Sequence, residues 1–357
     1  MKVLTVVGAR PQFIKAAPVS RALRAAGHTE FLVHTGQHYD HQMSRVFFDE
    51  MQIPEPDINL EVGSGSHAAQ TAQMLSKLEQ VMEGNKPDCV LVYGDTNSTL
   101  AGALAAAKLQ MPLAHVEAGL RSFNREMPEE HNRVLADHCS DYLFCPTQTA
   151  VDNLAREGIR SGVSLVGDTM FDAVLQFAKS AAERSTILEQ LNLTAKKFLL
   201  ATVHRAYNTD NPETLRGILA AFLELNETIV FPVHPRTRER ISRLGLCVVD
   251  SGIKMIEPVG YLDMLMLERN ARLILTDSGG MQKEAFFFGV PCVTLRPETE
   301  WIETVTAGWN VIAGVTPEGI NRAVKETDWP RESPAQIFGD GAAAQKIVKH
   351  LADRLSK

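Results

Sequence analysis

The sequence has few cysteines, and their placement argues against two classes of protein. Five cysteines occur in 357 residues, and none belongs to a C-x-x-C pair. Neither a disulfide framework nor a cysteine-based zinc site is indicated, and a reducing cytoplasm fits this composition. His34, His38 and His41 lie close together, but no cysteine or paired carboxylate completes a ligand set at a suitable spacing. We therefore expect polar loop residues here and no metal site.

The chain also lacks an excess of basic residues and a long apolar run. Its 36 lysines and arginines against 43 aspartates and glutamates give a net charge of -7, which argues against binding to nucleic acid. No apolar stretch is long enough to cross a membrane. Met1 and Lys2 lead directly into a predicted strand, so we expect neither a signal peptide nor a membrane partner. The first strand-to-helix turn is not a G-x-G-x-x-G turn, so no nicotinamide cofactor is expected.

Short apolar strands alternate with helices along the whole chain. Its length suggests two domains, and its composition, 45% hydrophobic and 22% charged, is ordinary for a globular protein. We predict two Rossmann-like, doubly wound α/β domains that face a central cleft, at residues 1–168 and 169–340. A C-terminal helix in 341–357 is expected to pack back on the first domain. Strands are predicted at residues 2–7, 31–35, 89–93, 111–116, 141–145, 163–166, 197–203, 228–233, 254–256, 271–275 and 290–295.

Two carboxylates follow predicted strands directly. Asp95 comes after the strand at 89–93, and Glu117 comes after the strand at 111–116, beside the turn at Gly119. Ligands of open parallel sheets bind at the carboxyl ends of the strands, where these side chains lie. Two carboxylates in different environments are what acid–base chemistry requires. The alternative for Asp95 is an ordinary helix N-cap.

A third group of charged residues follows at the start of a helix. Pro128 suits the first helical position, with Glu129 and Glu130 in the first turn, where the helix dipole favours carboxylates. Glu129 and Arg133 are four residues apart and share a face. These residues either contribute a further carboxylate to the site or form only a helix cap and a surface ion pair.

Several turns are suited to binding an anion. Arg10 and Lys15 flank the first strand-to-helix turn, and the alternative is an ordinary turn with two solvated cations. Ser278, Gly279 and Gly280 at a helix start form the best phosphate cradle, and the alternative is close helix–strand packing.

Other polar residues of the second half complete this set. Glu284, one turn into the helix that follows the glycines, could accept hydrogen bonds from a ribose diol. His204 and His234 follow two further strands. Two such halves facing each other favour a cleft for an anionic nucleotide that carries a sugar.

The combined motifs are specific to one family. In chain order they read G-A-R-P-Q-F-I-K, Y-G-D-T, H-V-E-A-G-L-R, P-E-E-x-N-R, H-R, V-H-P and D-S-G-G-x-Q-x-E-A. Together they resemble the non-hydrolysing UDP-N-acetylglucosamine 2-epimerase family over nearly the whole chain. The resemblance implies a GT-B-like fold, no NAD or metal cofactor, a homodimer and a role in surface polysaccharide biosynthesis, such as that of lipopolysaccharide O-antigen. It also implies removal of the C2 proton of a UDP-sugar, anti elimination of UDP, and re-addition with the proton on the opposite face.

The resemblance also implies roles for individual residues, although it does not decide which carboxylate is the base and which the acid. We favour Asp95 and Glu117 as the proton-handling pair. The implied catalytic residues are Asp95, Glu117, Glu129 and His204, and the implied UDP-binding residues are Arg10, Lys15, Arg133, His234, Ser278, Gly279, Gly280 and Glu284.

Some positions depart from the common UDP-N-acetylglucosamine enzymes. The stretch 37–43 is one residue longer, Ala206 replaces an arginine, and the loop 122–127 is shorter. These features are more similar to the branch that epimerises UDP-2,3-diacetamido-2,3-dideoxyglucuronate to the manno form. The extra carboxylate of that substrate needs a cation, for which Arg125 or Arg121 is the candidate. UDP-N-acetylglucosamine remains the alternative substrate.

Two more remote alternatives remain. A GT-B glycosyltransferase has the same architecture, and fold alone does not distinguish it. It requires an acceptor and shows no isotope exchange at C2. A non-catalytic UDP-sugar binder would bind the nucleotide tightly without turnover, and the retained Asp95, Glu117 and Glu129 argue against it.

Overall fold

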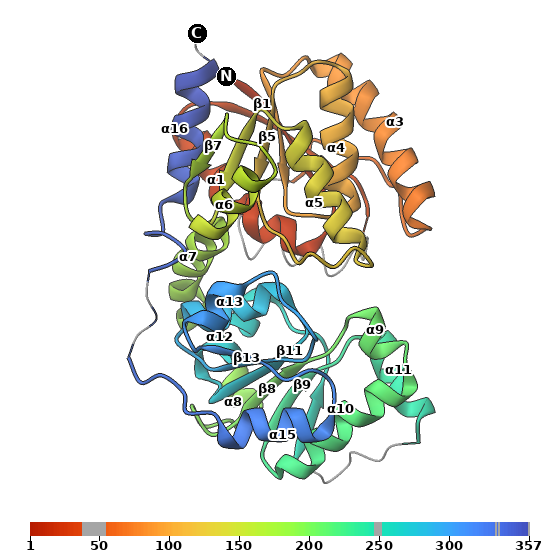
Figure 1. Cartoon of the computed structure of the whole chain (residues 1–357), viewed down its shortest axis with the longest axis vertical. Coiled ribbons are helices and arrows are strands. Elements are labelled where there is room, and N and C mark those ends of the chain that lie inside the picture. The colour runs from red at the N-terminus through yellow and green to blue at the C-terminus, as the bar shows by residue number, and fades with distance from the viewer. Residues whose placement is uncertain (38–54, 246–251, 333, 335, 356–357) are drawn as a thin grey trace. The chain divides into compact units, whose positions relative to one another are not determined.

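The computed structural model describes residues 1–37, 55–245, 252–332, 334 and 336–355, which form two compact units (Figure 1). One unit combines Met1–Leu175 with the C-terminal segment Gln336–Lys357, and the other is Gln176–Ala335. The division between them falls within helix α7 (Thr169–Arg184). Each unit has its own parallel sheet and its own hydrophobic core, as expected of a domain.

The first unit is built around a parallel sheet of short strands. They are β1 (Lys2–Val7), β2 (Thr29–His34), β3 (Ile58–Asn59), β4 (Cys89–Tyr93), β5 (Leu113–Val116), β6 (Tyr142–Cys145) and β7 (Val163–Leu165). Their order in the sheet is β3-β2-β1-β4-β5-β6-β7. The chain thus winds outward in both directions from β1 and β4, which lie next to each other. Such a switch point is where open α/β sheets bind their ligands.

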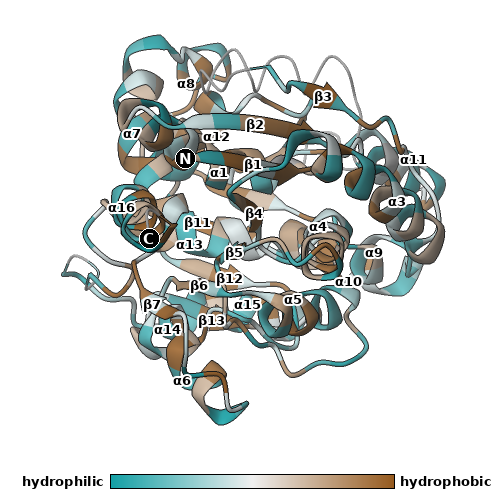
Figure 2. Ribbon diagram, turned by 90° about the horizontal axis from the view of Figure 1, so that it is seen from above, coloured by the Kyte–Doolittle hydropathy of each residue, from teal (hydrophilic) through white to brown (hydrophobic). Residues whose placement is uncertain are grey.

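Helices form two layers on this sheet, which Figure 2 shows from above. Helix α16 packs on α1, and α4 packs between α3 and α5. Figure 2 shows α4 as largely hydrophobic, because this alanine-rich helix is covered by its neighbours. At Gly102 a Cβ would lie only 3.0 Å from the Val92 side chain, so glycine allows α4 to approach β4 closely. The helices wholly within this unit are α1 (Arg10–Ala25), α3 (His67–Asn85), α4 (Asn97–Lys108), α5 (Pro128–Cys139), α6 (Gln148–Arg156) and α16 (Ala343–Leu355).

The second unit repeats the doubly wound pattern. Its strands are β8 (Leu199–Thr202), β9 (Ile229–Pro232), β10 (Ile253–Ile256), β11 (Leu273–Thr276), β12 (Cys292–Thr294) and β13 (Asn310–Ile312). The order β10-β9-β8-β11-β12-β13 gives a switch point between β8 and β11. Its helices are α8 (Ile187–Gln190), α9 (Ala206–Thr209), α10 (Pro212–Leu225), α11 (Pro235–Arg243), α12 (Tyr261–Asn270), α13 (Gly279–Phe287), α14 (Ile302–Thr306) and α15 (Pro317–Glu326).

These elements confirm the predicted α/β fold class and show where the predicted bounds differ. Strand β1 and strand β4 have the predicted bounds. Strand β5 begins at Leu113, two residues later than predicted, because Gln110 has a φ of 57° and Pro112 cannot donate to a ladder. The short strands β3 and β13 were not predicted. In the part of the chain that the structure describes, no helix is both long and apolar enough to span a bilayer.

Candidate functional site

Glu117 and Lys15 form an ion pair at the switch point of the first unit. Lys15 lies on α1, directly after β1, and Glu117 follows β5. The Lys15 Nζ pairs with the Glu117 Oε2, and both side chains are largely buried. At Gly94 a Cβ would lie 3.2 Å from each of these two atoms, so the glycine leaves room for the pair above its turn. The pair brings together Lys15, expected from the sequence to bind UDP, and Glu117, expected to transfer protons.

Glu117 also has a strained backbone. Its φ is 72°, in the left-handed region that residues with a side chain rarely adopt. The conformation lets the N–H groups of Glu117 and Ala118 both donate to the Phe144 carbonyl at 3.1 Å. Such a conformation costs on the order of 1–3 kcal/mol and clusters at functional sites. Seven other described residues with a side chain also have a positive φ, so the conformation points to a functional site at Glu117 only together with its ion pair to Lys15.

Asp95 lies at the end of the neighbouring strand and is paired as well. Its Oδ2 accepts from the Arg133 Nη2, and its carbonyl accepts from the Asn132 amide at 2.9 Å. Thr96 is the N-cap of α4 and accepts from the Thr99 N–H, so the N-cap alternative for Asp95 is wrong. Asp95 is thus a carboxylate held by a cation.

Arg133 is more completely enclosed than the sequence suggested. Its side chain is 2% exposed and pairs with Asp95 and, at 2.8 Å, with the Glu130 carboxylate. The sequence predicted Glu129 as the partner, but the pair uses the residue three positions before Arg133. Glu130 also accepts at 2.9 Å from the N–H groups of Ser122 and Phe123. Glu130 therefore holds both the loop and the arginine that pairs with Asp95.

The remaining residues expected in this unit lie around the start of α5. Pro128 begins the helix as predicted, and Glu129 in its first turn is half-buried. Arg125 is exposed on the preceding loop, and its carbonyl accepts from His131 Nε2 at 2.8 Å. Arg121, the alternative contact for a uronate carboxylate, is 5% exposed. That alternative is wrong, because carboxylates within the first unit enclose the guanidinium.

Two other expectations concern residues near the N-terminus. The Arg10 side chain, His38 and His41 lie outside the described residues. His34 is the buried last residue of β2 and not a loop residue, and burial lowers its pKa to about 4. Its Nδ1 accepts from the Gly36 N–H at 2.8 Å, and its ring stacks on Phe13. Within the described residues no group of three histidine, cysteine or acidic side chains is arranged to hold a metal.

Asp277 organises the switch point of the second unit. This fully buried carboxylate accepts from the N–H groups of His204 and Arg205 at 3.0 Å and from the Asn208 amide at 3.0 Å. Its other oxygen lies 3.3 Å from His204 Nδ1. In the sequence, Asp277 is noted only as the first residue of the D-S-G-G-x-Q-x-E-A motif. Its role depends on contacts with residues about 70 positions earlier, which no local pattern indicates.

The glycine turn after Asp277 begins α13. Ser278 is the N-cap and accepts from the Met281 N–H at 3.4 Å. A Cβ at Gly279 would lie 2.2 Å from Glu300 Oε1, so a side chain here would displace the Glu300 carboxylate. Gly280 is the next residue of the helix. The turn therefore presents backbone N–H groups and a helix N-terminus, as an anion site does.

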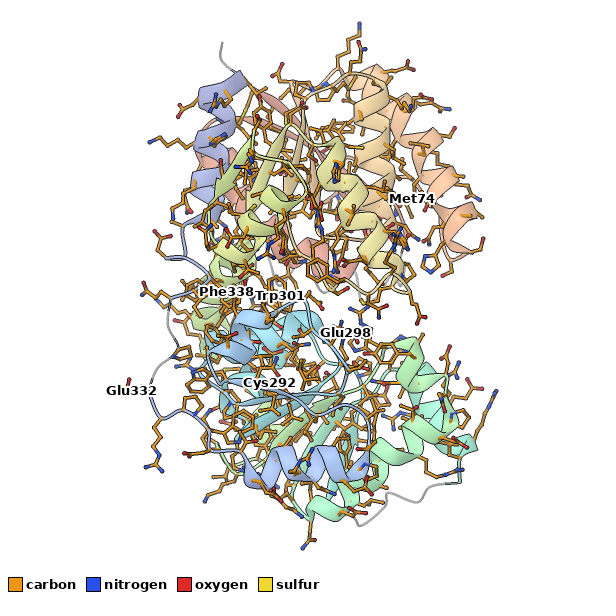
Figure 3. All side chains as sticks on the ribbon, in the orientation of Figure 1. Met74, Cys292, Glu298, Trp301, Glu332 and Phe338 are labelled. Carbon is orange, nitrogen blue, oxygen red and sulfur yellow. The ribbon has the colours of Figure 1, made fainter. Side chains whose placement is uncertain are left out.

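Charged side chains lie beside this turn. Glu300, which approaches Gly279, pairs with Arg296 at 3.0 Å, and both side chains are buried. The Lys283 Nζ lies 4.0 Å from the ring centroid of Trp301, which Figure 3 labels. Arg296 thus offsets the negative charge that Glu300 places beside this turn. The sequence did not indicate either cation as part of the site.

The other expected residues of the second unit differ in exposure. Glu284 is buried on α13 and accepts from the Tyr261 hydroxyl at 3.2 Å. His234 is exposed immediately before α11, and the His204 side chain is half exposed. Around β8 and β11 the structure thus brings together His204, Asp277 and the glycine turn.

Comparison with known proteins identifies the family. A model of the family described as UDP-N-acetylglucosamine 2-epimerase matches residues 21–352. The chain belongs to this family. Its members named below are epimerases, and the chain is accordingly an isomerase with the two-domain fold of the 2-epimerases.

Relatives of the 2-epimerase family align over nearly the full length. A UDP-N-acetylglucosamine 2-epimerase homolog of Methanococcus maripaludis is 54% identical, covering 98% of this chain and 99% of that protein. The UDP-2,3-diacetamido-2,3-dideoxy-D-glucuronate 2-epimerase of Pseudomonas aeruginosa is 49% identical, covering 99% of each. The crystal structure of Methanocaldococcus jannaschii UDP-GlcNAc 2-epimerase in complex with UDP-GlcNAc and UDP has a TM-score of 0.92. It is 45% identical and covers 99% of this chain and 100% of that one.

Proposed function

We propose that this 2-epimerase inverts C2 of a UDP-2-acetamido sugar by anti elimination and re-addition of UDP. A base removes the C2 proton, the C1–O bond breaks, and its electron pair leaves on the β-phosphate oxygen of UDP. The C1–C2 double bond that forms is then attacked at C1 by the same oxygen, while an acid protonates C2 on the opposite face. The observation that carries the proposal is the pair of cation-held carboxylates, Asp95 and Glu117, at neighbouring strand ends.

In this proposal Asp95 and Glu117 handle the protons, with Glu129 close by. A group that transfers protons needs a fixed position and a defined charge beside it. The ion pairs with Arg133 and Lys15 supply both for Asp95 and Glu117. Two carboxylates so placed suit proton transfer better than diphosphate binding, because they would repel the phosphates.

The second unit is proposed to receive the nucleotide. The turn of Ser278, Gly279 and Gly280 would bind the diphosphate through backbone N–H groups, and it would stabilise the charge that develops on departing UDP. Glu284 would accept hydrogen bonds from the ribose hydroxyls. In the structure it accepts one from the Tyr261 hydroxyl. Further contacts with UDP are proposed for Arg10, Lys15, Arg133, His204 and His234.

We favour UDP-2,3-diacetamido-2,3-dideoxyglucuronate as the substrate. The short loop 122–127 carries the exposed Arg125, which could pair with a uronate carboxylate, and Ala206 replaces an arginine of the common enzymes. The P. aeruginosa relative is named for this substrate. UDP-N-acetylglucosamine is the second candidate, because the 2-epimerases of M. jannaschii and M. maripaludis, both 46% identical, are named for it. We also propose a homodimer that serves surface polysaccharide biosynthesis, such as that of lipopolysaccharide O-antigen.

Incubation with each UDP-sugar in heavy water, followed by proton NMR, tests this function. We expect loss of the C2 proton signal together with the appearance of the manno epimer, without an acceptor. Faster conversion of the diacetamido-uronate would support the favoured substrate, and efficient conversion of UDP-N-acetylglucosamine alone would assign the second. Transfer of the sugar to an added acceptor without C2 exchange would indicate a glycosyltransferase, and binding without turnover a sensor.

A further inference from the structure

His115 lies in a buried cluster of charged groups directly behind the strand ends of the first unit. The residue is in β5 and is 0% exposed. Its Nδ1 lies 2.7 Å from the Asp137 Oδ1, and its Nε2 lies 2.7 Å from the Gly94 carbonyl oxygen. Both ring nitrogens are therefore at hydrogen-bond distance from an oxygen.

Those two oxygens determine the protonation state of the ring. The carbonyl oxygen of Gly94 only accepts hydrogen bonds, and so does an ionised carboxylate such as that of Asp137. A neutral imidazole has one N–H, so one of the two 2.7 Å contacts would place two lone pairs against each other. An imidazolium donates to both, which makes each contact favourable.

The charges around His115 agree with this state. Arg121 donates to Asp137 at 2.7 Å and to Glu157 at 2.6–2.7 Å. With a charged His115, these two cations balance the two carboxylates, of which Asp137 is fully buried and Glu157 lies at the exposed end of the cluster. Burial alone would raise the pKa of Asp137, but the hydrogen bonds and charges of His115 and Arg121 outweigh it and lower that pKa.

Two further titratable groups lie at the edge of the cluster. Cys145 on β6 is near enough for the charges of Asp137 and Arg121 to act on its thiol, and burial raises the pKa of Cys145. His138 on α5 is half exposed, with its Nε2 3.2 Å from the Glu157 Oε2. A buried thiol with a raised pKa stays neutral, so Cys145 adds no charge to the balance.

The cluster is connected to both carboxylates of the proposed reaction. The carbonyl that accepts from His115 belongs to Gly94, the residue immediately before Asp95. Glu117 lies two residues after His115, and the Asp137 carboxylate also accepts at 3.1 Å from the Gly119 N–H, two residues after Glu117. We propose that His115, as an imidazolium, is a positioning residue that fixes the spacing between Asp95 and Glu117.

This role rests on the proposed function, and it has a kinetic consequence that a purely structural role lacks. A displacement of about 1 Å at reacting groups can cost roughly a hundredfold in rate. The proposed UDP contacts of the second unit do not involve His115, and neither partner of its ring, Asp137 or Gly94, is a residue proposed to contact UDP. A positioning defect should therefore lower kcat while leaving the affinity for UDP unchanged, whereas general misfolding lowers both.

The protonation state can be measured without any assay of activity. In the wild-type protein labelled with ¹⁵N-histidine, the His115 ring is assigned by comparison with the His115→Gln variant. Because both ring nitrogens lie 2.7 Å from an acceptor oxygen, we expect both to carry a proton. A ring with one bare nitrogen at pH 7 would overturn the inference, whether or not the protein turns over any substrate.

The positioning role is tested by His115→Phe, His115→Gln and the control His28→Phe. His115→Phe removes both donated bonds, and we expect kcat to fall about a hundredfold with UDP affinity within about twofold of wild type. His115→Gln keeps one donor toward Gly94 and should recover part of the loss. His28, near the amino edge of the sheet, should tolerate phenylalanine without a change in kcat.

Three outcomes would contradict the positioning role. They are a His115→Phe enzyme within threefold of wild-type kcat, a parallel loss of UDP affinity, and equal kcat values for the two His115 variants. If His115→Phe does not fold, the kcat of His115→Gln relative to wild type decides, with a loss of at least threefold expected. If wild type converts neither UDP-sugar, the proposed function fails, and UDP affinity and the NMR result still report on the cluster.

Discussion

The two units build their strand-end sites in different ways. In the first, opposite charges on side chains pair at the switch point, as Lys15 does with Glu117 and Arg133 with Asp95. In the second, the buried carboxylate of Asp277 binds the backbone N–H groups of a loop, and a glycine turn presents backbone N–H groups of its own. Paired side chains can exchange protons, whereas fixed N–H groups suit a phosphate. On this difference we propose that the first unit carries the proton chemistry and that the second supplies the backbone N–H groups for the diphosphate.

The largest expected effect is on turnover, from changes in the first unit. Asp95→Asn and Glu117→Gln should each lower kcat by about 10²–10⁴-fold, because the amide cannot act as a general acid or base. The affinity for UDP, measured by calorimetry, should stay nearly unchanged. Glu126→Gln, on the exposed part of the neighbouring loop, is the matched control. Near wild-type turnover in either variant would remove that residue from the proton-transfer pair.

The next effect should be on stability and UDP binding, from the second unit. Asp277→Ala leaves the N–H groups of His204 and Arg205 without their acceptor, so we expect the free energy of unfolding to fall by about 3 kcal/mol. UDP affinity should fall with it. Asp210→Ala removes an exposed partner of Arg240 and should cost less than about 1 kcal/mol. Equal losses of stability in denaturant titrations of the two variants would contradict the organising role of Asp277.

A third prediction concerns regulation. UDP-N-acetylglucosamine should not activate this enzyme, because the family resemblance places at position 206 an arginine that helps to hold a second, activating UDP-N-acetylglucosamine, and this chain has Ala206. Loss of one charge-assisted contact costs about 1.5–3 kcal/mol, or roughly ten- to hundredfold in effector affinity. Initial rates against UDP-N-acetylglucosamine should show no sigmoidal dependence. Sigmoidal kinetics with efficient turnover of that sugar alone would contradict the expectation.

A smaller effect should distinguish the two candidate substrates. Arg125→Ala should lower kcat/KM for the diacetamido-uronate about tenfold, since an ion pair with its carboxylate is lost, and leave UDP-N-acetylglucosamine unaffected. Arg160→Ala, also exposed in the first unit, is the control. An equal effect on both substrates, or none on the uronate, would remove Arg125 from substrate recognition.

The smallest effect is expected from removal of metal. Treatment with a chelator should leave the rate unchanged, because the proposed chemistry uses only groups of the protein. Steady-state rates before and after dialysis against the chelator measure this. A loss of rate that is reversed by an added divalent ion would contradict a reaction that needs no metal.

Much of the fold could be predicted because the strands are short apolar runs ended by glycine or polar residues. The run before Gly94 is an example, and β4 has the predicted bounds. The edge strands β3 and β13 have only two and three residues and were missed. Strands β7 and β12 are as short, but each lies within a longer run, at 163–166 and 290–295, that ends before Gly167 or Arg296, and these runs were predicted.

The site was predictable only as a set of strand ends. Sequence position places Asp95 and Glu117 at one edge of a sheet, but their partners come from other elements. Arg133 lies 38 residues from Asp95, and Lys15 lies 102 residues from Glu117. Such pairs depend on how α1 and α5 pack on the sheet, and helix spacing alone did not indicate Glu130 as a partner of Arg133.

The most direct test of the assignment of chemistry to the first unit is C2 exchange in heavy water, starting from each epimer. We expect wild type to incorporate deuterium at C2 of both epimers. If the two residues act on opposite faces of the sugar, each removes the C2 proton of a different epimer. Asp95→Asn should therefore suppress exchange more strongly for one epimer, and Glu117→Gln more strongly for the other. Epimerisation without deuterium at C2, or equal suppression of both epimers in both variants, would contradict the account.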